Sequence, residues 1–324
     1  MSNKGISFVL SMYKTDSIKL INEFIDILPF KPLMMRPALL HKKVKYNKTD
    51  YIEAFEKALI ENSRCSAKIY NDYSNAICFR YDDISGVVTL IFHITNCKDE
   101  AELALLFEKI ITRNRIISAY FRDKLDNSLS SQNQISFYES LGIDTSNLKI
   151  IQDKMFKTNI IDIEQFSGHS HEYGGIQFTS TYIMWFGNDF FKFVPQETLT
   201  SFKDCIFNET LENGTIKIQL YDNINDYNSE EADHNQWAFR RHTNIDKIAE
   251  EWNLKYCKTT PDDLSGANMI IEHGNFEHGG VKLVKAYYDE NNKPTPKKKA
   301  FKVIYTEYNS KNTVVYQSEV NISK

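Results

Sequence analysis

Residues 67–95 read AKIYNDYSNAICFRYDDISGVVTLIFHIT, and runs rich in β-branched and aromatic residues alternate there with short polar segments. The runs are Ala67–Tyr70, Ala76–Tyr81 and Gly86–Thr95. Asn71-Asp72 and Asp82-Asp83 lie between the runs, and their short side chains favour turns because they bond to the nearby backbone. Strand-length runs joined by such turns predict an antiparallel meander.

Helical patterns lie on both sides of this meander. Residues 6–30 begin with alternation and turn helical from Asp16 to Leu28, and residues 49–61 form a short amphipathic pattern. After the meander, a long helix is predicted over residues 98–125, with Asn96 as its cap. Its apolar face needs a sheet to pack against, and the meander supplies one. That face consists of Leu103, Leu106, Phe107, Ile110, Ile117, Tyr120 and Phe121.

The second half of the chain has its own pattern. Ile176–Phe186 is rich in strand formers, and Asn213-Gly214 predicts a hairpin between Cys205–Leu211 and Thr215–Tyr221. A helical region follows over residues 229–253, where Asn228 and Glu231 fit a capping box and Thr243 is a point of interruption. The last predicted strands are Val281–Tyr288, Phe301–Tyr308 and Thr313–Ser318.

These patterns predict an α+β fold, with antiparallel sheets and packed helices in two lobes. A length of 324 residues suits two domains. We place residues 1–150 in a first lobe, which holds the meander and helix 98–125. Residues 151–324 form the second lobe, which holds the later strands, helix 229–253 and the C-terminal strands.

The composition argues against several classes of protein. Lys and Arg number 39 against 43 Asp and Glu, a net charge of −4, whereas proteins that bind nucleic acid are normally basic. Five scattered cysteines without a C-x-x-C pair indicate neither a disulfide framework nor a zinc ribbon. We find no signal-peptide core and no apolar run of membrane-spanning length. The composition therefore predicts a cytoplasmic protein that binds neither nucleic acid nor membrane.

The segment Gly168-His169-Ser170-His171-Glu172 contains the residues that most resemble a catalytic or metal-binding motif. An H-x-H pair on a strand places both imidazoles on one face, which suits a transition metal, and His273 and His278 could complete the site. The bland alternative is a pair of exposed loop histidines beside a glycine. Nucleotide-binding loops of the G-x-G-x-x-G or Walker type and a G-x-S-x-G elbow are absent, so we expect no enzyme and no cofactor.

An acidic stretch surrounds the start of helix 229–253. Acids at a helix start are stabilised by the partial positive charge of the helix N-terminus, and they can equally form a protein-binding face. The stretch consists of Asp222, Asp226, Glu230, Glu231 and Asp233.

Residues 175–255 contain three segments in a suggestive order. They are MWFGNDFF (184–191), then NG (213–214) followed by IQLYD (218–222), and finally QWAFRRH (236–242). Together they resemble a W-x-G-x-x-[FY]-[FY] segment, a central strand and a Q-x-x-F-R helix of the immunity proteins of bacterial polymorphic toxin systems, closest to the immunity protein 52 family. The rings of Trp185, Phe186, Phe190 and Phe191 are predicted to be mainly core.

The resemblance implies a function. Members of the family are cytosolic proteins that bind and neutralise a toxin domain delivered between competing bacterial cells, and they are not known as enzymes. It implies a cognate toxin domain as the partner, and it supplies no catalytic residues. We assign the contact to the five acids above. A metal-dependent enzyme using His169, His171, His273 and His278 is one alternative, and an interaction module unrelated to toxins is another.

Overall fold

The computed structural model describes residues 5–38, 42–61, 64–71, 75–82, 85–95, 97, 99–153, 158–256, 269–273, 282–295, 299–309 and 313–322. The chain divides into two compact units, residues 1–253 (unit 1) and residues 254–324 (unit 2). The fold is α+β, as predicted. None of the helices in the described ranges has the length and apolar character needed to cross a membrane.

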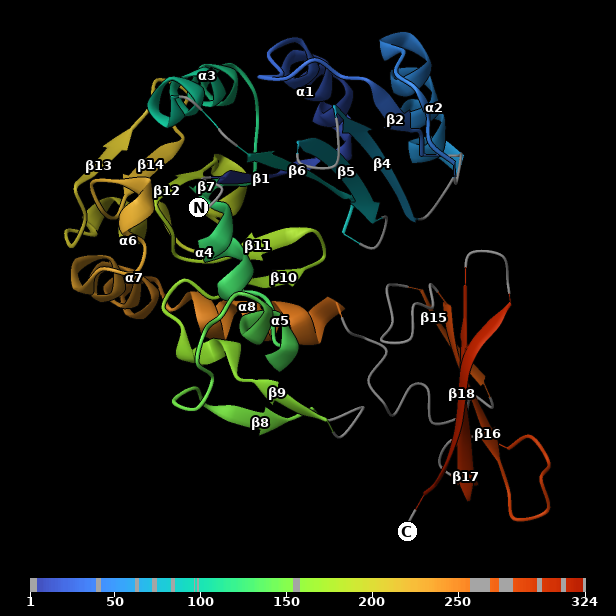
Figure 1. The fold of residues 1–324 in the computed structure, drawn as a ribbon. Coiled ribbons are helices and arrows are strands. Elements are labelled where there is room, and N and C mark those ends of the chain that lie inside the picture. Colours follow the sequence, from blue (N-terminus) through green and yellow to red (C-terminus); the bar gives the residue numbers. More distant parts are fainter. Residues whose placement is uncertain are drawn as a thin grey trace. The chain divides into compact units, whose positions relative to one another are not determined.

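The described part of unit 1 is organised by a ten-stranded sheet in which every neighbouring pair is antiparallel (Figure 1). In spatial order its strands are β13 (Phe207–Thr210), β14 (Ile216–Gln219), β12 (Ile183–Phe186), β7 (Ser118–Asp123), β1 (Gly5–Tyr13), β6 (Val87–Thr95), β5 (Ala76–Asp82), β4 (Arg64–Tyr70), β2 (Met34–Arg36) and β3 (Val44–Lys45). The predicted meander is confirmed as β4-β5-β6, and the predicted hairpin at Asn213-Gly214 as β13-β14.

Three helices cover one face of this sheet: α1 (Lys14–Asp26), α2 (Lys48–Glu61) and α3 (Glu100–Arg113) (Figure 1). Beneath α1 and α3, aromatic rings form a continuous cluster. Phe107 of α3 lies 4.3 Å from Phe8 of β1 between ring centroids, and 5.1 Å from Phe92 of β6. All three rings are fully buried, so apolar packing dominates beneath these helices.

The prediction of one long helix over residues 98–125 is wrong for the second half of that range. The helix α3 ends at Arg113, and residues 118–123 form β7 near the middle of the sheet. Ile117, Tyr120 and Phe121 fit helical spacing, but every residue of β7 is buried because the sheet is covered on both faces there. A strand buried on both faces lacks the polar alternation that distinguishes a strand from a helix.

The domain boundary also lies elsewhere than expected. The expected division near residue 150 falls inside unit 1. β7 pairs with β1 on one side and with β12 on the other, so residues from both expected lobes build one sheet.

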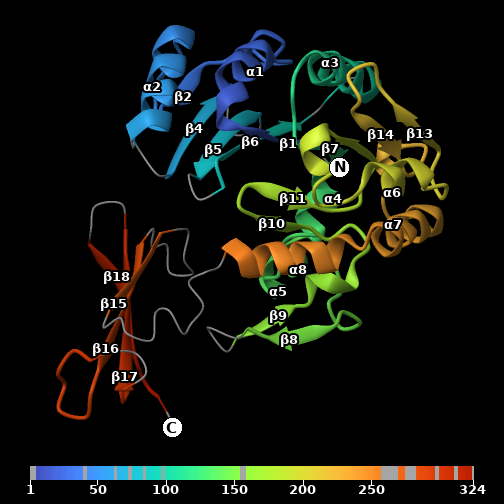
Figure 2. The ribbon, with the colours of Figure 1, turned by 180° about the vertical axis from the view of Figure 1, so that it is seen from behind.

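The second face of the sheet is covered by later segments (Figure 2). Gly175, at the turn of the β10-β11 hairpin, accepts hydrogen bonds from Ser11 Oγ of β1 and Thr89 Oγ1 of β6. Around this hairpin, Tyr120, Phe186, Phe190 and Phe239 belong to a second apolar core. The elements on this side are β10 (His171–Tyr173), β11 (Ile176–Phe178), α4 (Lys124–Leu129), α5 (Ile135–Ser140), α6 (Gln196–Ser201), α7 (Glu230–Thr243) and α8 (Ile245–Tyr256). The small β8-β9 hairpin (Ile150–Gln152 and Asn159–Ile161) contacts α5 and lies away from the sheet (Figure 2).

The aromatic segment behaves largely as predicted. Trp185, Phe186 and Phe190 are buried, whereas Phe191 is only half-buried. Gly187 lies against the backbone just before β7, because a Cβ there would stand 2.1 Å from the Ile116 carbonyl oxygen. No side chain fits in that space, so the glycine of this segment is required by close backbone approach.

Helix boundaries differ in detail from the sequence expectation. Asp99 caps α3 by accepting from the Glu102 backbone N–H, while Asn96 lies outside the described residues. Ser229 caps α7 in place of Asn228, because its Oγ accepts from the Ala232 N–H. The interruption expected at Thr243 occurs one residue later, where Asn244 adopts a left-handed conformation with φ of 57°.

Unit 2 contains a four-stranded antiparallel sheet in the order β15 (Met269–His273), β16 (Lys282–Tyr288), β17 (Lys302–Tyr308) and β18 (Val314–Asn321). The three predicted C-terminal strands are therefore confirmed. The described core of this unit is small and centres on Tyr287, Ala300 and Val303.

Candidate functional site

The carbonyl oxygens of residues 167–169 are held by side chains from other parts of the chain. Each of these three oxygens accepts two such hydrogen bonds, at 2.7–3.3 Å. The donors are Ser180 Oγ and Arg240 Nη1 to Ser167, Thr179 Oγ1 and Arg122 Nη1 to Gly168, and Thr179 Oγ1 and Arg240 Nη1 to His169. Residues 167–169 are thus a buried segment whose backbone is fixed in one arrangement.

His169 is part of this segment and is only 2% exposed, so the expectation of an exposed loop histidine is wrong for it. Its Nδ1 lies 2.6 Å from the Phe166 carbonyl oxygen, and its Nε2 lies 2.5 Å from Arg240 Nη2. Its Nδ1 can donate to that carbonyl, while its Nε2 lies between Arg240 and the Asp246 carboxylate, 3.2 Å from Oδ1.

Arg240 of α7 brings the charge that organises this region. Its guanidinium donates through Nε and Nη2 to the two carboxylate oxygens of Asp246, in the first turn of α8. Burial pushes the pKa of Asp246 upward, but hydrogen bonds from His169 and Arg240 outweigh it and hold that pKa well below its usual value. The pair neutralises a buried cation and ties α7 to α8.

His169, His171 and Asp246 are the group with a metal-like arrangement in the described part of the chain. One ligand atom from each lies within 4.8 Å of the others. A metal ion would need the His169 Nε2 lone pair and the Asp246 carboxylate, and both are already bonded to Arg240. Burial, with His169 and Arg240 next, lowers the pKa of His171. His273 ends β15 in unit 2, and His278 lies outside the described residues.

A second buried arginine, Arg122 of β7, holds the segment from the other side. Its Nη1 donates to Gly168 O, and its Nη2 donates to Ser170 Oγ and Asn127 Oδ1. Burial lowers the pKa of Arg122, and the charge of Asp126 acts against that change. This region, which we name the polar junction, comprises Arg122, Asp126, Ser167–Ser170, Gln236, Arg240 and Asp246.

Asp126 is a buried carboxyl group in the first turn of α4. It accepts from Ser130 Oγ at 3.1 Å and from Thr181 Oγ1 at 3.4 Å. Burial raises its pKa to about 6, although Arg122 and the two hydroxyl bonds act in the opposite direction. Asp126 therefore changes its protonation state close to neutral pH.

A cavity of about 460 Å³ opens beside the polar junction. It lies between α4, α5, the segment 165–168 and the start of α7. Asp126 and Gln236 line it, and Glu230 and Asp233 lie among the exposed residues of its lining. Two of the five predicted acids thus border a hollow that the sequence did not indicate.

All five predicted acids are exposed and follow one another along the surface from the end of β14 to the first turn of α7. Asp226 ends the short 3-10 helix Ile224–Asp226, and Glu230, Glu231 and Asp233 lie in the first helical turn. Within the described residues, none of the five side chains has a cation within 4.0 Å. We name this exposed stretch of five acids the acidic ridge.

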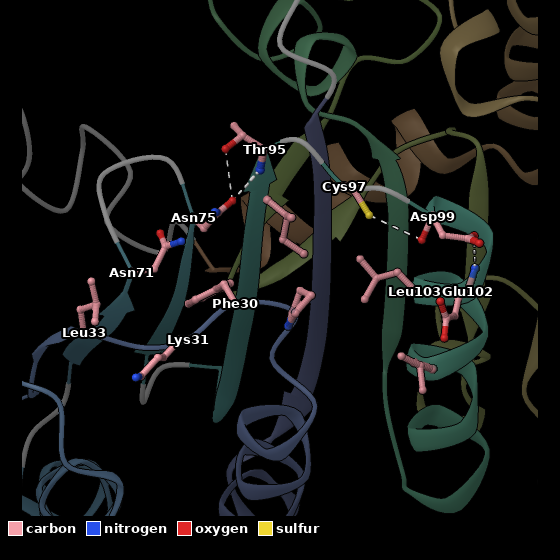
Figure 3. Close-up of a pocket in the computed structure, with 13 residues that line it drawn as sticks. Phe30, Lys31, Leu33, Asn71, Asn75, Thr95, Cys97, Asp99, Glu102 and Leu103 are labelled. Atoms are coloured by element: carbon pink, nitrogen blue, oxygen red, sulfur yellow. Dashed lines mark hydrogen bonds between the residues drawn. The ribbon is translucent and has the colours of Figure 1, made fainter.

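Another hollow, of about 850 Å³, lies at the other side of unit 1, where α3 begins (Figure 3). Phe30, Leu33 and Leu103 give it apolar walls, and the Asp99 cap lies at its margin. Among the described residues that line it, none leaves a buried side-chain polar atom without a hydrogen-bond partner. We therefore regard the polar junction and its cavity as the stronger candidate site.

Sequence reasoning missed most of the polar junction. Gln236 and Arg240 were noticed only as parts of the family-like segment QWAFRRH, and Arg122, Asp126 and Asp246 were not singled out. One signal was present. Gln236 and Arg240 stand four residues apart on the same face as Ala232 and Phe239, so two polar side chains share the buried face of an amphipathic helix.

Comparison with protein-family models, curated proteins and solved structures finds no match to this chain. The resemblance to immunity proteins therefore stays a prediction, and functional inference depends on the site itself.

Proposed function

We propose that this chain is a cytosolic immunity protein, which binds and neutralises the toxin domain of a competing bacterium. The observation that carries the proposal is the acidic ridge, with five exposed carboxylates and no basic partner among the described residues. The order of the three family-like segments supports it. The partner would present a basic or cation-lined surface.

The physical role of the ridge would be steering. Exposed charges of one sign accelerate encounter with an oppositely charged protein, and they act mainly on the association rate. Lasting affinity would come from a few buried contacts elsewhere in the interface. Three of the acids also stabilise the start of α7 through the helix dipole, worth about 0.3–1 kcal/mol each, so a test must separate the two roles.

The metal-dependent alternative loses support in this structure. Arg240 already bonds the two groups that a metal ion would need, His169 Nε2 and the Asp246 carboxylate. To bind a metal ion there, the guanidinium of Arg240 would have to leave its carbonyl partners. Each buried polar group that then lacks a hydrogen-bond partner would cost about 1–3 kcal/mol.

The test changes Asp226, Glu230 and Asp233 to Lys and measures association with a candidate toxin domain, which is first sought among the products of the genes next to this one. We expect the association rate at low salt to fall at least tenfold, and its salt dependence to flatten. The matched control changes three exposed acids of α2, Asp50, Glu53 and Glu56, to Lys, for the same change in net charge.

The outcomes separate the surface from the function. Equal loss in both variants would indicate a net-charge effect and reject the acidic ridge as the contact. If wild-type protein fails to bind that toxin domain and fails to protect cells that express it, the immunity function itself is refuted.

A further inference from the structure

The cavity beside the polar junction combines an apolar wall with a polar floor. Leu129, Ile143, Leu148 and Phe166 supply apolar surface, and Tyr138 closes one side. Its volume of about 460 Å³ falls in the range of pockets that hold small molecules or single side chains.

The polar floor is built around Gly168. A Cβ at this glycine would lie 3.1 Å from Ser130 Oγ, 3.3 Å from Asp126 Oδ1 and 3.4 Å from Gln236 Nε2. Three polar atoms, two from α4 with its C-cap residue and one from α7, therefore converge on one point. A side chain at residue 168 would crowd all of them, so glycine keeps the floor open.

Gln236 has a donor without a partner at this floor. Its Oε1 accepts from Ser167 Oγ at 2.5 Å, which holds the amide in place. Its Nε2 makes no hydrogen bond although the residue is only 1% exposed. A buried donor without an acceptor is costly, and few such groups occur in native proteins. The free N–H therefore indicates a place for an acceptor from outside the chain.

Asp126 offers the complementary capacity. Its carboxyl group has about four acceptor positions when ionised, and the hydroxyls of Ser130 and Thr181 use two of them. The floor thus presents an N–H donor and a carboxylate acceptor side by side.

We propose that this cavity binds a carboxamide, whose C=O accepts from Gln236 Nε2 while its N–H donates to Asp126. An ammonium group would suit Asp126 but would leave Gln236 facing another donor. A carboxylate would suit Gln236 but would meet the charges of Asp126, Glu230 and Asp233. The carboxamide satisfies both floor groups, and it comes either from a small molecule or from an Asn or Gln side chain of another protein.

This inference is independent of the proposed immunity function, because its test needs no toxin. Saturation-transfer NMR on the full chain compares benzamide with benzoate, which has nearly the same shape. A second arm compares a capped Gly-Gln-Gly peptide with capped Gly-Glu-Gly. We expect the amide of at least one pair to bind saturably and at least tenfold more tightly than its acid, because the acid leaves Asp126 unsatisfied.

Two variants locate the binding. Gln236→Glu keeps an oxygen that accepts from Ser167, replaces the free N–H donor by a second oxygen and adds a negative charge beside Asp126, so amide binding should fall at least tenfold. Leu148→Trp fills the cavity from its half-buried wall without touching the floor, and it should abolish binding even if the first variant folds poorly. Its matched control is Leu141→Trp, at an exposed position outside the cavity lining, which should bind like wild type.

The results distinguish the two sources of a carboxamide. Preference for benzamide alone assigns the site to a small molecule, and preference for the glutamine peptide alone assigns it to a protein side chain. Equal binding of amide and acid, binding that survives Leu148→Trp, or no saturable binding by either amide would each overturn the proposal.

Discussion

Two buried regions share the central strand β7 and are built in opposite ways. Phe121 points into the aromatic core beneath α3, with its ring 6.1 Å from that of Phe107. The next residue, Arg122, points to the other face and enters the polar junction. On the first side the stabilisation comes from burial of apolar surface area, and it does not depend on the direction of individual contacts. On the second side each group depends on a particular partner at a particular distance.

The difference teaches where specificity resides in this molecule. An aromatic core tolerates exchange between apolar groups of similar volume, and it offers nothing for a ligand to recognise. The polar junction fixes the backbone of residues 167–169 in one arrangement, and the fixed arrangement leaves the Gln236 donor directed at a cavity. Predictions that distinguish the two regions follow, ordered by the size of the expected effect.

The largest effect is expected in the aromatic core. Phe107→Ala should lower the free energy of unfolding by about 4 kcal/mol, because the buried ring leaves a cavity that rigid neighbours fill only in part. Urea denaturation measures this change. Leu105→Ala on the same helix, where Leu105 is 54% exposed, is the control and should cost less than about 0.5 kcal/mol. A loss below about 1 kcal/mol for Phe107→Ala would show that the core repacks.

The polar junction should respond almost as strongly but in a different way. Arg240→Met keeps most of the volume, yet it should cost about 3 kcal/mol because Asp246 and two carbonyls lose their partner. Adding Asp246→Asn should restore about 1 kcal/mol by removing the unpaired charge. The exposed neighbour Arg241→Met serves as the control. Strictly additive losses in the double variant would contradict the pairing.

The smallest of the three effects concerns pH, which should act on the polar side of the sheet. Burial lowers the pKa of His93 in β6 to about 4, and Lys124, Lys68, Arg80 and Arg122 add to that shift. The unfolded chain takes up a proton near pH 6.5 while the folded ring stays neutral. The stability is therefore fully present above pH 6.5 and is lost as pH falls toward 4.

Between pH 7 and pH 5 this loss should reach about 2 kcal/mol, an upper value because the ring keeps some contact with water. His93→Gln should flatten the dependence of the free energy of unfolding on pH in that interval. The exposed His234→Gln controls for removal of one imidazole. An identical pH profile for wild type and His93→Gln would show that the ring is not kept neutral.

Much of the fold could be predicted from local patterns, and the exceptions share one cause. β4, β5 and β6 alternate or are bounded by turn residues, so their sequence identifies them. β7 is buried on both faces, and its apolar residues fit a helix as well as a strand. The local pattern therefore predicted that the helix continues through Phe121. Only the pairing of β7 with β1 and β12 shows that this segment is a strand. That pairing joins segments that are far apart in the chain.

The candidate site was less predictable for the same reason. The five acids lie next to one another in the sequence, so the acidic ridge could be anticipated. The polar junction joins Arg122, His169, Arg240 and Asp246, which come from separate elements. Two histidines in an H-x-H pattern left a metal site open as an alternative, but the cation they meet is an arginine whose position no local pattern shows.

The place of β7 in the sheet has a consequence for the making of the protein. Its partner β1 is already present when β7 leaves the ribosome, but β12 is synthesised about 60 residues later. At about 5–20 residues per second, one edge of this strand, which is buried in the folded protein, waits roughly 3–12 s for its neighbour. Unpaired strand edges invite pairing with other chains. Nascent copies of this protein therefore depend on being kept apart during that interval, and codon-level changes that slow translation between residues 123 and 183 should lengthen the hazard.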